Sequence, residues 1–120
     1  MSLRIYQDAT AVITGAASGI GKALAIELSR RGCTVVLADR QVALAESVAA
    51  AIVSNGGNAW ARELDVCDYP AMQTIVDEAF TNTGRLDYMF NNAGIGIGGF
   101  AEDYEVEDWN TTIDVNLRGV

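Results

Sequence analysis

The feature that most constrains this chain is the alternation of short apolar runs with segments of helical periodicity. Residues 11–14 (AVIT) and 34–38 (TVVLA) are short apolar runs that are typical of buried strands. Between them, residues 20–28 place apolar side chains at i, i+4 and i+8, which predicts a helix that ends at a basic turn over residues 30–32. Strands that alternate with helices pair in parallel through right-handed crossovers, so the pattern predicts an α/β sheet covered on both faces.

The same alternation continues through the rest of the chain, without a repeat or a linker. A helix with Leu44, Val48 and Ile52 is predicted next, followed by a strand over 60–66. The third predicted helix runs from the N-cap Asp68 to Gly84, and its apolar stripe consists of Met72, Ile75, Val76, Ala79 and Phe80. A strand over 86–90 and a last helix with Val106, Trp109, Ile113 and Leu117 complete the pattern. The predicted fold is a doubly wound (Rossmann-like) parallel sheet with strand order 3-2-1-4, spanning residues 1–120 as one domain. Its switch point lies between the first and fourth strands.

Composition excludes several classes of function. None of the 120 residues is a histidine, so a Ser-His-Asp triad and any histidine-ligated metal site within this chain are excluded. Acids outnumber bases 16 to 8 and no basic patch exists, so nucleic acid is a poor partner. No apolar run approaches the roughly 18 residues that span a membrane. Two cysteines in a chain without a recognisable signal peptide indicate reduced thiols and a cytoplasmic location.

The glycine-rich segment TGAASGIG, residues 14–21, lies between the first predicted strand and the first helix. Such a loop aims backbone N–H groups and a helix N-terminus at an anion. Gly15 permits a sharp turn, Gly19 leaves room for a pyrophosphate, and Gly21 lets the helix approach the sheet. A nucleotide-triphosphate P-loop is rejected, because position 16 lacks its glycine and position 23 lacks its hydroxyl.

An acidic residue, Asp39, closes the second predicted strand, eighteen residues after Gly21. In a dinucleotide-binding fold this acid accepts hydrogen bonds from the ribose hydroxyls and repels a 2′-phosphate, which favours NAD over NADP. Arg40 can stack on adenine or pair with a 2′-phosphate, so NADP stays possible. The alternative is that Asp39 and Arg40 only cap the following helix.

The ends of the third and fourth predicted strands carry further polar residues. Asp65 and Val66 would lie beside an adenine, or Asp65 is a turn residue that leads to the Asp68 cap. The NNAG segment over 91–94 faces the glycine loop across the switch-point crevice and suits a nucleoside sugar, although an ordinary Asn/Gly turn has the same composition.

Asn116 shares a face of the last predicted helix with Trp109. A buried amide there must be hydrogen-bonded, so Asn116 either organises an active site or belongs to a fraying helix end.

Together these residues resemble the short-chain dehydrogenase/reductase family. The resemblance rests on TGAASGIG at 14–21, Asp39, LDV around Asp65, NNAG at 91–94 and DVNLRGV at 114–120. It implies an NAD(P)-dependent oxidoreductase that transfers hydride between a secondary alcohol or ketone and nicotinamide, and that forms a homo-oligomer (dimer or tetramer). The implied roles are the diphosphate lining (Gly15, Ser18, Gly19, Ile20, Gly21), NAD selection (Asp39), adenine contact (Asp65, Val66), further cofactor lining (Asn92, Ala93, Gly94) and the catalytic asparagine (Asn116). In such an enzyme, Gly96, Gly98, Gly99 and Phe100 are expected to edge the substrate cleft.

The sequence departs from the family in one respect. The family's catalytic Ser and Tyr-x-x-x-Lys pair are absent, because no lysine stands four residues after any of the four tyrosines. By the resemblance, these groups lie downstream of the position of Val120. The chain is therefore expected to be the cofactor-binding N-terminal half of such an enzyme, truncated relative to the family's domain and inactive alone. The alternative is a non-catalytic nucleotide-binding or interaction module of 120 residues.

Overall fold

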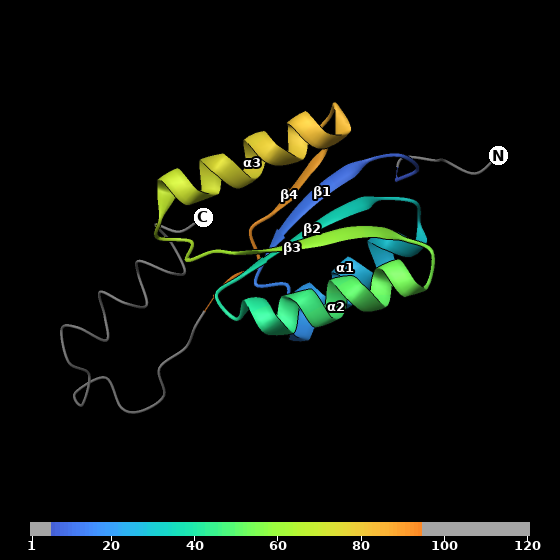
Figure 1. Cartoon of the computed structure of the whole chain (residues 1–120), viewed down its shortest axis with the longest axis horizontal. Helices are drawn as coiled ribbons and strands as arrows, with labels where there is room; N and C mark the ends of the chain where they lie inside the picture. The colour runs from blue at the N-terminus through green and yellow to red at the C-terminus, as the bar shows by residue number, and fades with distance from the viewer. Residues whose placement is uncertain (1–5, 95–120) are drawn as a thin grey trace.

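A single parallel sheet organises the computed structural model, which describes residues 6–94 (Figure 1). The elements in chain order are β1 (Thr10–Thr14), α1 (Gly19–Arg30), β2 (Thr34–Asp39), α2 (Val42–Ser54), β3 (Asn58–Glu63), α3 (Tyr69–Thr83) and β4 (Tyr88–Phe90). The strand order is β3-β2-β1-β4 and every pairing is parallel. The predicted doubly wound sheet with order 3-2-1-4 is thereby confirmed.

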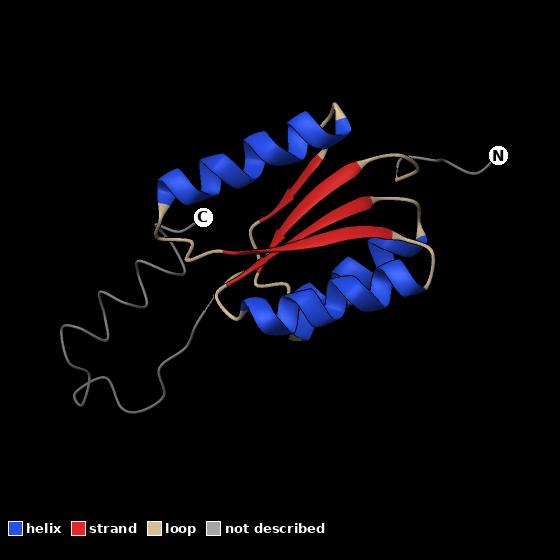
Figure 2. Cartoon of the chain, viewed as in Figure 1, coloured by secondary structure: helices blue, strands red, loops and turns tan. Residues whose placement is uncertain are grey.

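The helices cover both faces of the sheet, with α1 and α2 on one face and α3 on the other (Figure 2). Alternate residues of each central strand enter opposite cores, as the two-residue period of a strand requires. In β1, Ala11 and Ile13 belong to the core under α1 and α2, whereas Val12 packs with Ile75 and Ala79 of α3. Because both faces are buried, the central strands are continuously apolar rather than alternating.

The ends of α3 follow the signals in the sequence. The Asp68 carboxylate accepts a hydrogen bond from the Ala71 N–H at 3.1 Å, and Pro70 occupies the first turn, where its missing N–H costs no bond. Gly84 ends the helix in the left-handed conformation with φ of 80°. Both predicted boundaries of this helix are confirmed. Among residues 6–94, no helix is both long and apolar enough to cross a membrane.

Three predicted core positions on the helices are wrong. Ile20, Leu44 and Phe80 are 78%, 49% and 57% exposed. Small neighbours are buried in place of Ile20 and Leu44, namely Gly21 in α1 and Ala45 in α2, whereas the predicted positions Leu28, Val48, Ile52, Ile75 and Ala79 are buried as expected. The buried residues are Gly21, Ala25 and Leu28 in α1, Ala45, Val48, Ala49 and Ile52 in α2, and Ile75 and Ala79 in α3.

Two strand boundaries also differ from the prediction. β3 ends at Glu63 rather than at residue 66, because β2, its partner, ends at Asp39 opposite Glu63. β4 starts at Tyr88 rather than at residue 86, since only three residues of β1 pair with it. The helix predicted near the C-terminus lies outside the described residues.

Candidate functional site

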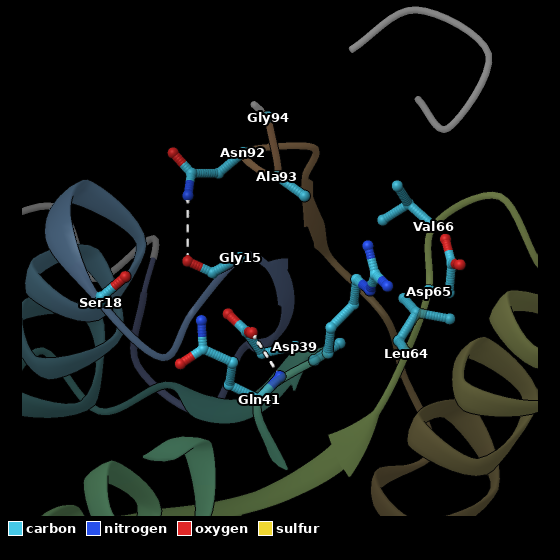
Figure 3. A pocket seen from close by; sticks show the side chains of 12 residues that line it. Gly15, Ser18, Asp39, Gln41, Leu64, Asp65, Val66, Asn92, Ala93 and Gly94 are labelled. Carbon is cyan, nitrogen blue, oxygen red and sulfur yellow. Dashed lines mark hydrogen bonds between the residues drawn. The ribbon is translucent and has the colours of Figure 1, made fainter. Parts of the chain in front are cut away.

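A cavity of about 610 Å³ opens at the carboxyl ends of the four strands and includes the switch point between β1 and β4 (Figure 3). Four segments line it, one after each strand. They are Gly15 and Ser18 after β1, Ala38 to Gln41 at the end of β2, Leu64 to Val66 after β3, and Asn92 to Gly94 after β4. The fold thus brings together residues that stand up to 79 positions apart (94 − 15).

The first three N–H groups of the glycine loop are bound to the end of β2. The carbonyl of Ala38 accepts from Gly15 at 2.9 Å and from Ala16 at 3.5 Å. The next donor, the Ala17 N–H, binds the Asp39 carboxylate at 3.0 Å. These bonds fix the loop across the top of β1 and β2 before α1 begins.

The donors that follow in the loop are available to a ligand. Within residues 6–94, the N–H groups of Ser18, Gly19 and Ile20 have no hydrogen-bond acceptor, as expected for the first turn of a helix. The first turn of α1 holds no acidic side chain. The positive end of the helix dipole and three free donors therefore offer a site for an anion.

Gly19 and Gly21 meet different surroundings. A Cβ on Gly19 would have no atom within 4 Å, so the space above this residue is open. A Cβ on Gly21 would lie 2.2 Å from the Gly15 carbonyl oxygen and 2.6 Å from Asn92 Nδ2. Gly19 therefore leaves room for a ligand, whereas Gly21 lets α1 pack directly beneath the loop.

Asn92 is bound to the glycine loop through its side-chain amide. Its Nδ2 donates to the carbonyls of Thr14 and Gly15, each at 3.3 Å (Figure 3 draws the Gly15 contact). The buried Thr14 hydroxyl donates to the Phe90 carbonyl and accepts from the N–H groups of Asn92 and Ala93, at 3.1 and 3.0 Å. This network joins the ends of β1 and β4, and it uses the amide donors that the sequence suggested for a sugar.

Asp39 is not the N-cap of α2. The helix begins after Gln41, whose side chain makes no capping bond, and Asp39 Oδ1 instead accepts from the Gln41 N–H at 2.9 Å. This is a local turn of the Asx type. The capping alternative for Asp39 and Arg40 is therefore wrong in its strict form, and both residues line the cavity.

Asp65 and Val66 lie beyond the end of β3, not within it. Asp65 Oδ1 accepts from the Cys67 N–H at 2.9 Å, and its backbone carbonyl accepts from the Asp68 N–H at 2.8 Å. Asp65 thus makes the turn before α3, which was the alternative reading, and it also lines the cavity. Val66 is buried against the α3 side of the sheet.

The predicted site residues divide into three groups. Those that line the cavity are Gly15, Ser18, Asp39, Arg40, Asp65, Val66, Asn92, Ala93 and Gly94. Gly19, Ile20 and Gly21 do not line it but form the adjoining start of α1. Asn116 and the cleft residues predicted over 96–100 lie outside the described residues.

Ala38, Gln41 and Leu64 also line the cavity and were missed in the sequence. Ala38 and Leu64 are buried residues at strand ends whose apolar character indicates only core packing. Only their position next to Asp39 and Asp65 in the sequence could have indicated that they line the cavity.

Comparison with known proteins decides the family. A family model described as short chain dehydrogenase matches residues 9–120. The chain belongs to the short-chain dehydrogenases. Among solved structures, a short-chain dehydrogenase/reductase from Burkholderia phymatum in complex with NAD superposes with a TM-score of 0.91 at 32% identity, over 95% of this chain and 41% of that one. A metagenomic short-chain oxidoreductase in complex with NADP gives 0.87 at 35% identity, over 94% and 52%.

Curated proteins that are similar to the chain include two dehydrogenases named for alcohol substrates. A cyclohexanol dehydrogenase of Acinetobacter sp. (strain SE19) is 39% identical over 116 residues, covering 96% of this chain and 46% of the relative. A meso-2,3-butanediol dehydrogenase of Serratia marcescens is 35% identical over 115 residues, covering 96% and 45%. The chain thus spans slightly less than half the length of these relatives.

Proposed function

We propose that residues 1–120 form the N-terminal, NAD-binding portion of a dehydrogenase that interconverts a secondary alcohol and a ketone. The observation that carries the proposal is the cavity at the switch point, where free backbone donors, an acid and an amide-bearing turn meet. When bound, the nicotinamide would supply the hydride acceptor or donor. The residues present fit such a dinucleotide, because the space above Gly19 is open and the N–H groups of the first helical turn are free.

The proposed contacts follow the order of the lining segments. The N–H groups of Ser18, Gly19 and Ile20 would hold the diphosphate, with Gly15 and Gly21 keeping the loop close to the sheet. The Asp39 carboxylate would accept hydrogen bonds from the ribose hydroxyls. The turn over 64–66 would flank the adenine, and the segment over 92–94 would line the remainder of the cofactor.

The preference for NAD rests on charge. Asp39 lines the cavity with a carboxylate that would repel a 2′-phosphate. Arg40 lines the same cavity and could pair with the 2′-phosphate of NADP, which would then bind more weakly than NAD. The two solved relatives bind NAD and NADP respectively, so the family accommodates both nucleotides.

The substrate class and the catalytic residues are also proposals. Cyclohexanol and 2,3-butanediol, the alcohols in the names of two relatives, both carry a secondary hydroxyl. Asn116 is proposed as the catalytic asparagine that acts with the Tyr-x-x-x-Lys pair of the family, which this sequence lacks. A homo-oligomer in the cytoplasm is proposed as well. The proposed location rests on the interpretation of the two cysteines, Cys33 and Cys67, as reduced thiols.

Isothermal titration with NAD and NADP tests the proposed site. We expect NAD to bind at least about tenfold more tightly than NADP, a difference of about 1.4 kcal/mol. ADP-ribose should bind comparably to NAD if the described loops supply most of the contacts. Failure to bind any of the three contradicts the proposal and favours an interaction module, whereas a preference for NADP assigns the selectivity to Arg40.

A further inference from the structure

The carboxylate of Asp39 is bound on both of its oxygens before any ligand arrives. Oδ2 accepts from the Ala17 N–H of the glycine loop at 3.0 Å, and Oδ1 accepts from the Gln41 N–H at 2.9 Å. Figure 3 shows Asp39 beneath Gly15, between the loop and the start of α2. The side chain therefore links two backbone segments that are 24 residues apart in the sequence (41 − 17).

The bond to Ala17 completes the attachment of the loop to β2. Gly15 and Ala16 donate to a backbone carbonyl, which no substitution of a side chain removes. The Ala17 donor depends on the Asp39 side chain alone, and Ala17 is only 7% exposed, so water is a poor substitute. The free donors begin at the very next residue, Ser18, and their direction depends on where Ala17 is held.

We infer that Asp39 is a positioning residue for the anion-binding loop, in addition to its proposed contact with ribose. The consequence for ligands rests on the proposed function: loss of the Asp39 carboxylate weakens diphosphate binding even in a nucleotide that has no ribose hydroxyls. A role in ribose recognition alone gives the opposite result. In that case, removing a negative charge near a diphosphate leaves its binding unchanged or improves it.

The ligand 2′,3′-dideoxy-ADP separates these two roles, because it keeps the adenine and the diphosphate but lacks both hydroxyls. Its affinity for the wild-type protein, D39A and D39N is measured by isothermal titration. We expect D39A to bind it about tenfold more weakly, the effect of one lost charge-assisted hydrogen bond. D39N should lie closer to wild type, since its amide oxygen can still accept from Ala17. Equal or tighter binding by D39A overturns the inference.

Hydrogen exchange of the Ala17 amide, followed by NMR without nucleotide, tests the same inference independently. We expect D39A to exchange this amide at least about tenfold faster, with D39N between D39A and wild type. D65A is the matched control: Asp65 lines the same cavity, but its carboxylate binds the Cys67 N–H and not the loop, so Ala17 exchange should not change. Unchanged exchange in D39A overturns the positioning role.

The two measurements also separate this inference from the proposed function. If the wild-type protein binds no nucleotide, the proposed function fails, while faster Ala17 exchange in D39A still supports the positioning role. If D39A does not fold, as thermal melting would show, D39N decides alone. Its uncharged oxygen makes a weaker bond, so Ala17 exchange at the wild-type rate in D39N overturns the inference.

Discussion

Gly21 is the residue of the glycine loop with the least room. A methyl group there would overlap the Gly15 carbonyl and the Asn92 amide, and the first of these is backbone that cannot rotate away. We expect Gly21→Ala to lower the free energy of unfolding by about 2 to 3 kcal/mol, the usual cost of forcing extra volume into a packed site. Urea denaturation monitored by circular dichroism measures the change.

Gly19→Ala is the matched control, since its Cβ would meet open space. Its backbone φ of 57° lies in the left-handed region, which costs a non-glycine residue about 1 kcal/mol. The variant should therefore lose about 1 kcal/mol of stability, and its methyl group should obstruct the diphosphate. A loss in Gly19→Ala as large as in Gly21→Ala would contradict this account of the loop.

The Thr14 hydroxyl joins the ends of β1 and β4 through three hydrogen bonds. In Thr14→Val the shape is kept, but the Ala93 N–H loses its acceptor, whereas the Asn92 N–H keeps a hydrogen bond to the Phe90 carbonyl at 3.0 Å. We expect the free energy of unfolding to fall by about 1 to 3 kcal/mol, the cost of one unsatisfied buried donor. Thr14→Ser keeps the hydroxyl and should recover most of the loss in urea denaturation. If the serine variant were as unstable as the valine variant, the lost methyl group would be responsible instead.

At the residue level, the sequence predicted which side chains gather at the site better than it predicted their partners. Asn92 was assigned to the cavity correctly, yet its amide donates to Thr14, which is 78 residues away in the chain. Periodicity and local turn composition report neighbours within a few residues. The bonds from Asn92 to Thr14 and from Asp39 to Ala17 depend on how β1 lies against β4 and β2, which only the folded sheet defines.

At the scale of elements, the order and type of every described strand and helix could be predicted, but several boundaries could not. Leu64 and Val66 resemble strand residues because both are buried against the α3 side of the sheet. Their burial comes from the turn that closes over the core, after the pairing with β2 has ended at Glu63. The apolar character of Leu64 and Val66 therefore predicted their burial correctly but predicted the end of β3 incorrectly.

β4 is attached to β1 at the amino end of the sheet by a charged side chain. Asp87 Oδ2 accepts from the Thr10 N–H at 2.8 Å, and the Arg85 guanidinium pairs with both carboxylate oxygens. The hydrogen bond from Arg85, and then that from Thr10, lower the pKa of the Asp87 carboxyl below its usual value of about 3.9. Because the carboxyl pKa is lower in the folded state than in the unfolded state, ionised Asp87 stabilises the fold at every pH above the usual carboxyl pKa. This stabilisation is lost as the pH falls through the folded-state pKa.

Thermal melting between neutral pH and pH about 2 tests this link between β1 and β4. We expect Asp87→Asn to melt below the wild type at neutral pH. The difference should begin to shrink as the pH falls below about 4, where Asp87 becomes protonated in the unfolded state, and it should vanish only at the lower pH where the folded state is protonated as well. Asp77→Asn is the control, because this exposed carboxylate on α3 accepts from the neutral amide of Gln73. A gap between Asp87→Asn and wild type that stays constant with pH would contradict the assignment.

For the whole molecule, the two ends of the sheet differ in the groups that they carry. The amino end carries the Asp87 link, whereas the carboxyl end carries the cavity and the free donors of α1. This separation follows from parallel topology, since every strand of a doubly wound sheet presents its carboxyl end to the same edge. The location of the cavity was therefore predictable from the order of elements alone.

The last prediction concerns turnover by a polypeptide of these 120 residues. Oxidation of a secondary alcohol releases a hydride and a proton, and the proton needs a base within hydrogen-bond reach of the hydroxyl. The sequence contains no histidine and no Tyr-x-x-x-Lys pair, and its single lysine, Lys22, is exposed on the first turn of α1.

We therefore expect the homogeneous polypeptide, verified by intact mass, to bind NAD in titrations but to form no NADH above the buffer rate with cyclohexanol or 2,3-butanediol. An authentic short-chain dehydrogenase assayed in parallel shows that the conditions permit turnover. NADH formation that scales with the concentration of the polypeptide would contradict the prediction and require a proton acceptor among the residues present. Inactivity together with NAD binding would assign proton transfer to groups that this sequence does not contain.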